Sequence, residues 1–190
     1  MELKDCIKIY DNALPPQTVG SLIKWLHDQK FFPGLVGDKG QINKNIRNAD
    51  VLDLTQEKDI KITGMHWRNL LAYIFNTGIK QYGKDVSPHY PTGVQGVREI
   101  SVLKYDNCGF YEPHVDHFHA IPRLFSSILL LNNDYEGGQL CFTDPINKSI
   151  IKTIDVQVGR LIVWPSIFLF PHGVKPVTKG IRYAVVGWAF

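Results

Sequence analysis

The chain has 190 residues, enough for one well-buried core and short for two full domains. Hydrophobic residues make up 44% and charged residues 21%, values near the average for a globular protein, which excludes a disordered or fibrous chain. The net charge of +3 is too small to indicate a nucleic-acid partner, which would need clustered basic residues. We therefore expect one globular domain without a nucleic-acid partner.

Cysteine spacing and the N-terminal segment bear on the compartment. Cys6, Cys108 and Cys141 form no Cys-x-x-Cys pair, so neither a disulfide framework nor a cysteine zinc site is indicated. The first residues carry acids and no apolar run typical of a secretory signal, and no stretch approaches the ~18 apolar residues that cross a membrane. We expect a soluble, cytoplasmic protein without a membrane partner, and the oligomeric state is not indicated.

Two helices are predicted in the first half of the chain. The first follows Pro15 and Pro16, because proline is tolerated in a first helical turn and apolar residues then recur at three- and four-residue intervals up to Leu26. The second begins near Thr63 and buries apolar residues between 67 and 75. The intervening segment 31–54 is rich in Gly, Asn, Asp and Lys, which predicts an irregular or hairpin excursion.

From Val97 onward the pattern changes to short β-prone runs separated by turn clusters. Strands at roughly eight- to twelve-residue intervals indicate a sandwich or barrel of about eight strands. The predicted fold class is therefore mainly β with supporting N-terminal helices, an α+β arrangement.

A candidate metal site lies in GFYEPHVDH, residues 109–117. In a strand, alternation would place His114 and Asp116 on one face, as two ligands of one metal require. The same face would carry Phe110 and Glu112. His172, in LFPHGV, is the best-placed third ligand, and two histidines with one carboxylate suit non-haem Fe(II) with coordination positions left open.

The His-x-Asp pair is weak when taken alone. The chain has seven histidines, and a surface or core histidine beside an aspartate is the ordinary alternative. His117 would face away from His114, and His119 lies beyond the predicted strand, so neither is expected to be a ligand.

Arg182 strengthens the site. Alternation in GIRYAVVGW places Arg182 on one face with Ala184, Val186 and Trp188. An arginine on the inward face is costly unless it meets an anion, and its planar fork suits a carboxylate. The alternatives are a structural ion pair or a side chain that faces solvent.

Three segments carry a family resemblance, which covers residues 97–190. YDNCGFYEPHVDH (105–117) resembles the first iron-binding motif of the prolyl hydroxylase branch of the 2-oxoglutarate oxygenases. RLFSSILLLNNDYEGGQLCF (123–142) resembles the next segment, and GRLIVWPSIFLFPHGVKPVTKGIRYAVVGWAF (159–190) resembles the closing one. On these motifs the chain is identified as a member of the Fe(II)- and 2-oxoglutarate-dependent dioxygenases, of the prolyl 4-hydroxylase family and its short bacterial and viral type.

The resemblance implies a fold and a set of roles. The fold is a double-stranded β-helix, a jelly-roll of the cupin-like kind. It would fill a single domain, 1–190, with helical support and a substrate-covering loop in 1–96 and the core in 97–190. His114, Asp116 and His172 would bind Fe(II), Arg182 would pair with the distal carboxylate of 2-oxoglutarate, and Tyr105 would line the co-substrate pocket.

Substrate contacts are implied at three positions. Tyr111 and Trp188 match residues that line the site, and Phe32–Asp53, which contains Arg47, resembles the loop that covers the substrate. Core packing and an ordinary surface hairpin are the alternatives. Gly137 and Gly138 are expected to serve a turn.

The chain also departs from the family. Leu130 stands where animal oxygen-sensing members have a tyrosine that contacts the co-substrate, and collagen-type members have lysine in place of Arg182. The contacts to the co-substrate beyond Arg182 are therefore open.

The implied reaction is prolyl 4-hydroxylation of a peptide or protein, using Fe(II), 2-oxoglutarate, O2 and ascorbate, with release of succinate and CO2. Three alternatives stay open: hydroxylation of another side chain or small molecule, a zinc hydrolase with the same three ligands, and an inactive β-barrel that serves as a binding module.

Overall fold

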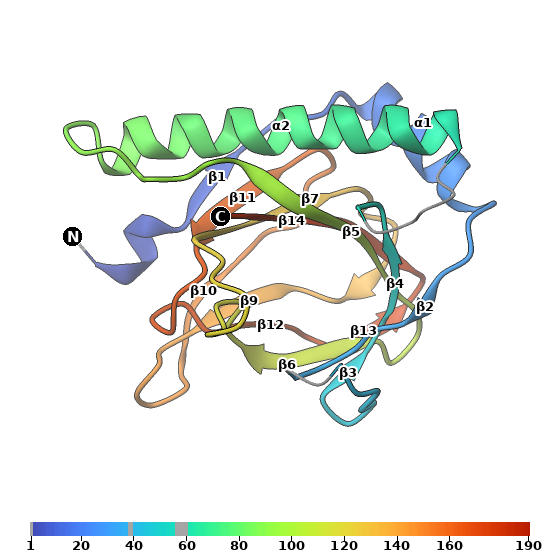
Figure 1. The fold of residues 1–190 in the computed structure, drawn as a ribbon. Helices are drawn as coiled ribbons and strands as arrows, with labels where there is room; N and C mark the ends of the chain where they lie inside the picture. Colours follow the sequence, from blue (N-terminus) through green and yellow to red (C-terminus); the bar gives the residue numbers. More distant parts are fainter. Residues whose placement is uncertain (1, 38–39, 56–60) are drawn as a thin grey trace.

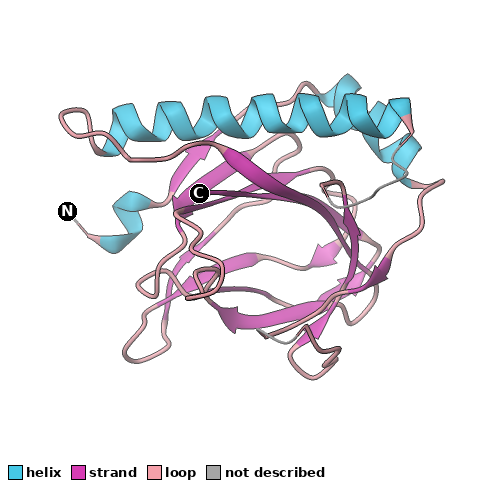
Figure 2. Ribbon diagram, in the orientation of Figure 1, coloured by secondary structure: helices cyan, strands magenta, loops and turns pink. Residues whose placement is uncertain are grey.

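The computed structural model describes residues 2–37, 40–55 and 61–190. Two antiparallel sheets face each other and enclose the interior of the molecule, while the two α-helices lie on one side, outside the larger sheet (Figures 1 and 2). The helices are η1 (Leu3–Cys6), a 3-10 turn, α1 (Pro16–Leu26) and α2 (Ile62–Val86). No helix in these ranges is long and apolar enough to cross a membrane.

The major sheet has seven strands. In spatial order they are β1 (Lys8–Tyr10), β11 (Leu161–Pro165), β7 (Phe125–Leu130), β14 (Arg182–Ala189), β5 (Val97–Tyr105), β4 (Asp50–Asp53) and β2 (Phe32–Pro33).

The minor sheet has five strands, and a separate pair lies beside it. The minor sheet runs β10 (Ile150–Thr153), β9 (Leu140–Thr143), β12 (His172–Val174), β6 (Phe110–His114) and β3 (Arg47–Asn48), and the pair is β13 (Val177–Lys179) with β8 (Glu136–Gly137).

The predicted fold class is confirmed: the molecule is a double-stranded β-helix with supporting helices. Helix α1 starts at Pro16, and β5 covers Val97–Tyr105, as the sequence predicts. The structure contains more strands than the eight or so that the sequence predicts, because several span only two to four residues. Such strands are too short to show an alternating pattern in the sequence. They are stabilised by the neighbouring strands with which they pair.

The major sheet separates two hydrophobic cores. One core lies between this sheet and the helices, and it takes Tyr183 and Val185 from β14. The other fills the space between the two sheets, and it takes Ala184 and Val186 from the same strand. Because successive side chains of a strand point to opposite faces, one strand supplies both the helix-packing surface and the interior of the barrel.

Helix α2 packs on the major sheet at points where the sheet lacks a side chain. A Cβ on Gly187 of β14 would lie 2.6 Å from Cδ2 of Phe75 and within 3.0 Å of two further ring atoms. The Phe75 ring is fully buried and lies directly on the strand backbone. Any side chain at position 187 would therefore lift the helix from the sheet.

We expect Gly187→Ala to lower the free energy of unfolding by about 1–3 kcal/mol, because overpacking a filled core costs that much. Urea unfolding followed by circular dichroism measures it. Gly20→Ala is the matched control: Gly20 lies in α1, is exposed and has no heavy atom within 4 Å of its added Cβ. That control should gain about 0.5–1 kcal/mol. Equal stability of the two variants would contradict this packing.

Candidate metal centre and its pocket

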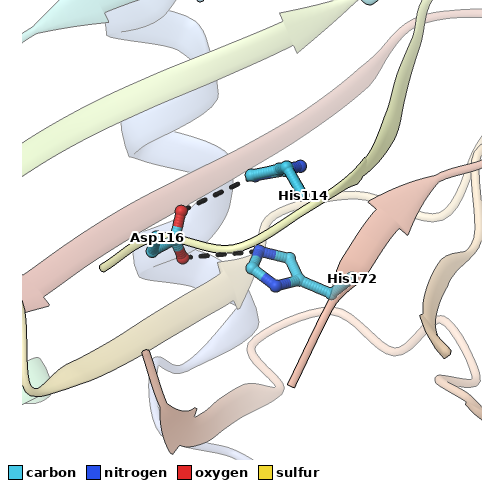
Figure 3. Close-up of side chains that lie close together, drawn as sticks. All are labelled: His114, Asp116 and His172. Carbon is cyan, nitrogen blue, oxygen red and sulfur yellow. Dashed lines mark ion pairs between the residues drawn. The ribbon is translucent and has the colours of Figure 1, made fainter. Parts of the chain in front are cut away.

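Three side chains converge between the sheets. His114 ends β6, His172 begins β12, and these two residues are direct partners in the antiparallel ladder. The Asp116 carboxylate lies between the rings, with Oδ1 3.6 Å from Nε2 of His114 and Oδ2 3.4 Å from Nε2 of His172 (Figure 3). One ligand atom from each residue lies within 4.8 Å of the other two, so together they could hold one metal ion.

A β-bulge shapes the strand that carries His114. His114 pairs with His172 and Tyr111 pairs with Val174, so Glu112 and Pro113 of β6 lie opposite the single residue Gly173. A bulge re-aims the side chains that follow it. As a result, the Tyr111 ring stacks on the His114 ring, with centroids 3.6 Å apart and planes 19° apart.

This bulge overturns the predicted alternation. The sequence placed Phe110, Glu112, His114 and Asp116 on one face, but Tyr111 is the residue that shares the face of His114, and Glu112 is exposed. The strand ends at His114, and Asp116 lies beyond it in a bend. The grouping of His114 with Asp116 is found, but strand alternation is the wrong reason for it.

Backbone carbonyls orient both histidine rings. Nδ1 of His114 lies 2.9 Å from the Glu112 carbonyl oxygen, and Nδ1 of His172 lies 3.1 Å from the Phe170 carbonyl oxygen. Since a carbonyl only accepts a hydrogen bond, each Nδ1 carries the hydrogen. In the neutral ring Nε2 then has a free lone pair, and Nε2 is the atom that faces Asp116, which is the form a metal ligand needs.

The electrostatics favour a carboxylate beside neutral histidine. Burial raises the pKa of Asp116, but His172, His114 and the hydrogen bond from Ser126 outweigh burial and hold that pKa well below its usual range. Burial lowers the pKa of His172 to about 4, although the negative charge of Asp116 opposes this shift. At neutral pH the group therefore offers the negative charge of Asp116 and the unprotonated Nε2 of His172, donors that suit a divalent cation.

A cavity of about 210 Å³ adjoins the three residues. Its inner wall is largely apolar and is formed by residues of both sheets: Leu103, Tyr105, Ile128, Leu140, Val174 and Val186. Leu35 and Ile121 lie on its outer side and are partly exposed to solvent. The cavity thus connects the candidate metal centre with the interior of the barrel.

Arg182 is inside the barrel, as alternation predicts. It is fully buried, and its guanidinium carbon lies 5.0 Å from the centroid of the Tyr105 ring. Its three nitrogens have no hydrogen-bond partner within the described ranges. An unpaired buried cation costs several kcal/mol, so this arrangement suits a bound anion better than a structural ion pair.

Tyr135 is a neighbour of Arg182 that the sequence analysis missed. Its hydroxyl is buried and, in the part of the chain described, makes no hydrogen bond. A Cβ on Gly138 would lie 3.0 Å from Cδ of Arg182 and 3.1 Å from Cε2 of Tyr135, so both side chains rest on this glycine. Burial raises the pKa of Tyr135, while the charge of Arg182 opposes the rise. Gly138, expected only to serve a turn, also makes room for Arg182.

Arg47 and Trp188 both lie at the cavity. The Arg47 guanidinium carbon lies 4.8 Å from the Tyr111 ring centroid, which gives a stack of Arg47, Tyr111 and His114. Trp188 lines the cavity and packs under Arg123, whose guanidinium carbon lies 3.9 Å from the indole centroid. Arg47, Tyr111 and Trp188, the three residues expected at the substrate side, therefore all line this cavity.

The segment Phe32–Asp53, predicted as an irregular or hairpin excursion, contains an antiparallel pairing of β2 with β4. Residues 38 and 39 lie outside the described residues, and the short strands β2, β3 and β4 are joined by turns and loop. Strand β3 pairs with β6 and β4 pairs with β5, so the segment joins the two sheets beside the cavity.

Several neighbours of the three candidate ligands were also missed by the sequence analysis. Ser126 donates a hydrogen bond to Asp116, and the Trp164 ring lies edge-on to His172 with centroids 4.8 Å apart. The two serines in the otherwise apolar run LFSSILLL are a signal that could have been used. His117 and His119 are exposed and do not belong to the group of three, in agreement with the prediction.

Comparison with known proteins gives three kinds of match. Residues 100–190 match the family model of the 2OG-Fe(II) oxygenase superfamily. Human prolyl 3-hydroxylase 2 is 39% identical over 88 residues, which are 44% of this chain and 12% of that protein. Chicken prolyl 3-hydroxylase 1 is 44% identical over 66 residues, which are 35% of this chain and 9% of that protein. The chain thus spans about an eighth or less of these relatives.

Solved structures show the same fold over almost the whole chain. A Trichoplax adhaerens prolyl hydroxylase, in complex with a peptide of hypoxia inducible factor, has a TM-score of 0.76 at 21% identity and covers 98% of this chain and 84% of its own. A Pseudomonas putida prolyl-4-hydroxylase has a TM-score of 0.69 at 19% identity, with 97% and 92% covered. The viral collagen prolyl hydroxylase of Paramecium Bursaria Chlorella virus-1 has a TM-score of 0.66 at 16% identity, with 97% and 95% covered.

Gly173 tests the bulge. A Cβ there would lie 2.7 Å from the Tyr111 carbonyl oxygen and 3.0 Å from the Pro113 nitrogen, and these backbone atoms cannot rotate away. We expect Gly173→Ala to separate β6 from β12, to cost about 1–3 kcal/mol of unfolding free energy, and to weaken Mn(II) binding at least about tenfold. Metal titration with urea unfolding measures both quantities. Native Mn(II) affinity in a folded Gly173→Ala protein would contradict the role of the bulge.

Proposed function

We propose that the chain, whose residues 100–190 match the family model of the 2OG-Fe(II) oxygenase superfamily, is a prolyl hydroxylase that uses Fe(II) and 2-oxoglutarate. The observation that carries the proposal is the presence, inside one barrel, of three convergent metal-ligand side chains and a buried arginine without a partner in the described ranges. The first group fits Fe(II), and the second fits a carboxylate.

In this proposal each group has one task. His114, Asp116 and His172 hold Fe(II), and the metal supplies the activation of O2 that is coupled to decarboxylation of 2-oxoglutarate to succinate and CO2. The protein needs no general base for this reaction, so its tasks are to hold the metal, orient the co-substrate, place the target carbon and exclude water. Ascorbate as an additional reductant, and a cytoplasmic location, belong to the same proposal.

Arg182 binds the distal carboxylate of 2-oxoglutarate in this scheme, and Tyr105 forms the wall beside it. Leu130 has no hydroxyl to offer at the position where some family members have tyrosine. Tyr135 has one, buried and close to Arg182. We therefore assign Tyr135 as the hydroxyl donor that accompanies Arg182 in this chain.

The proposed substrate is a proline-containing peptide or protein. Support comes from the solved relative that holds a peptide, and from the partly apolar outer side of the cavity, where Leu35 is 52% exposed. Arg47, Tyr111 and Trp188 line the cavity and would contact the peptide, with the segment Phe32–Asp53 covering it. A zinc hydrolase with the same three ligands has no evident use for the buried arginine, and neither does an inactive barrel.

A panel of proline-containing peptides, incubated with the protein, Fe(II), 2-oxoglutarate and air, tests the reaction. We expect one oxygen to be added to proline, with equimolar succinate, as measured by mass spectrometry. Amino-acid analysis should give the 4-hydroxy isomer, whereas the 3-hydroxy isomer would correct the ring position. The His114→Ala variant is the control and should give neither product. Succinate without hydroxyproline would overturn the substrate and keep the oxygenase.

The co-substrate pocket is tested by apparent affinity. Arg182→Ala should raise the 2-oxoglutarate KM about 10- to 100-fold, since a hydrogen bond to a charged group contributes about 1.5–3 kcal/mol. Tyr135→Phe should raise it about 3- to 10-fold through loss of one hydroxyl. Tyr183→Phe is the matched control, because Tyr183 adjoins Arg182 but faces the helices. An unchanged KM in Arg182→Ala would place the anchor elsewhere.

A further inference from the structure

Asp116 is not held in place by the sheet. Strand β6 ends at His114, and the residues from 115 to 117 have no ladder partner in the described structure. Its carboxylate is nevertheless buried, with 4% of the residue exposed. Another set of contacts must therefore position it.

Two serines supply these contacts from the neighbouring strands. Oγ of Ser126, in β7, lies 2.6 Å from Oδ2 of Asp116, and Oγ of Ser166, directly after β11, lies 2.7 Å from Oγ of Ser126. Both serines are buried, with 0% and 1% of the residue exposed. The backbone also takes part, since the His117 N–H donates to the Ser166 carbonyl oxygen at 3.1 Å.

The chemistry of these groups fixes the direction of the hydrogen bonds. An ionised carboxylate only accepts, so Ser126 donates its single hydroxyl hydrogen to Oδ2. Ser126 then has no hydrogen left for Ser166, and Ser166 must donate to Ser126. The order is Ser166 to Ser126 to Asp116, and each bond polarises the next one.

We propose that Ser166 and Ser126 form a relay that positions Asp116 as a metal ligand through one oxygen. Oδ2 receives the relay, whereas Oδ1 faces Nε2 of His114 at 3.6 Å. The relay thus leaves Oδ1 free to coordinate the metal and keeps the carboxylate from rotating. Ser126 and Ser166 are positioning residues, and the inference rests on the proposed function, because it assumes the metal site.

Ser127 provides a matched control in the same strand. It is as buried as Ser126, at 0% exposed, and its Oγ has no hydrogen-bond partner in the described residues. As the next residue of β7 it points to the other face of the sheet. Loss of this hydroxyl removes the same atom from an equally buried position, without touching the relay.

The experiment is an anaerobic titration with Mn(II), followed by the electron paramagnetic resonance signal of the free ion. We expect Ser126→Ala to weaken Mn(II) binding about tenfold, at the low end of the 10- to 100-fold range for partners of metal ligands. Ser166→Ala should weaken it about threefold, because Ser126 keeps its bond to Asp116. Ser127→Ala should bind like the wild type, and His114→Ala should lose binding.

The double variant separates a relay from a general loss of packing. Since Ser166 acts only through Ser126, Ser126→Ala/Ser166→Ala should bind Mn(II) as Ser126→Ala does. Additive losses in the double variant, wild-type affinity in Ser126→Ala, or an equal loss in Ser127→Ala would overturn the relay. Failure of the wild-type protein to bind Mn(II) would instead overturn the proposed function, and the relay with it.

Discussion

A carboxylate that leaves water must regain hydrogen bonds or opposite charge from the protein. Asp116 regains one such hydrogen bond from β7 through Ser126, and its carboxylate faces the imidazoles at the ends of β6 and β12, with which it could share a cation. These strands belong to both sheets, so the sheets have to approach each other at this point. Much of the local geometry follows from that requirement, including the bulge opposite Gly173 and the stacking of Tyr111 on His114.

The interior also contains the opposite charge. Arg182 is fully buried at the start of β14, and Tyr105, its ladder partner in β5, lies beside it and lines the cavity. The barrel therefore has an anionic group that suits a metal and a cationic group that suits a carboxylate, with apolar walls around the cavity. A small dicarboxylate such as 2-oxoglutarate would suit this distribution of charge, in agreement with the family model that residues 100–190 match.

Regular patterns in the sequence predicted the regular parts of the fold. Helix α1 buries the apolar face that its periodicity predicts, and β14 alternates between the two cores from Tyr183 to Val186. Alternation fails at β6, because Glu112 and Pro113 both lie opposite the single residue Gly173. The residues after this bulge therefore no longer point to the faces that alternation predicts. Ser126 and Tyr135 could not be assigned either, because their roles depend on partners 10 and 47 positions away along the chain, namely Asp116 and Arg182. Motif resemblance, rather than periodicity, brought Arg47 into the predicted site.

One residue separates β3 from β4, and this has a mechanical consequence. Ala49 lies between a strand that is bonded to the minor sheet and a strand that is bonded to the major sheet. A segment tied in this way cannot swing open as a hinged flap unless its ladder bonds break. Widening of that side of the barrel is then a local unfolding event, and its free energy sets how slowly the amide hydrogens of the strand exchange with solvent. Access to the interior would be governed by the fraying of a sheet edge.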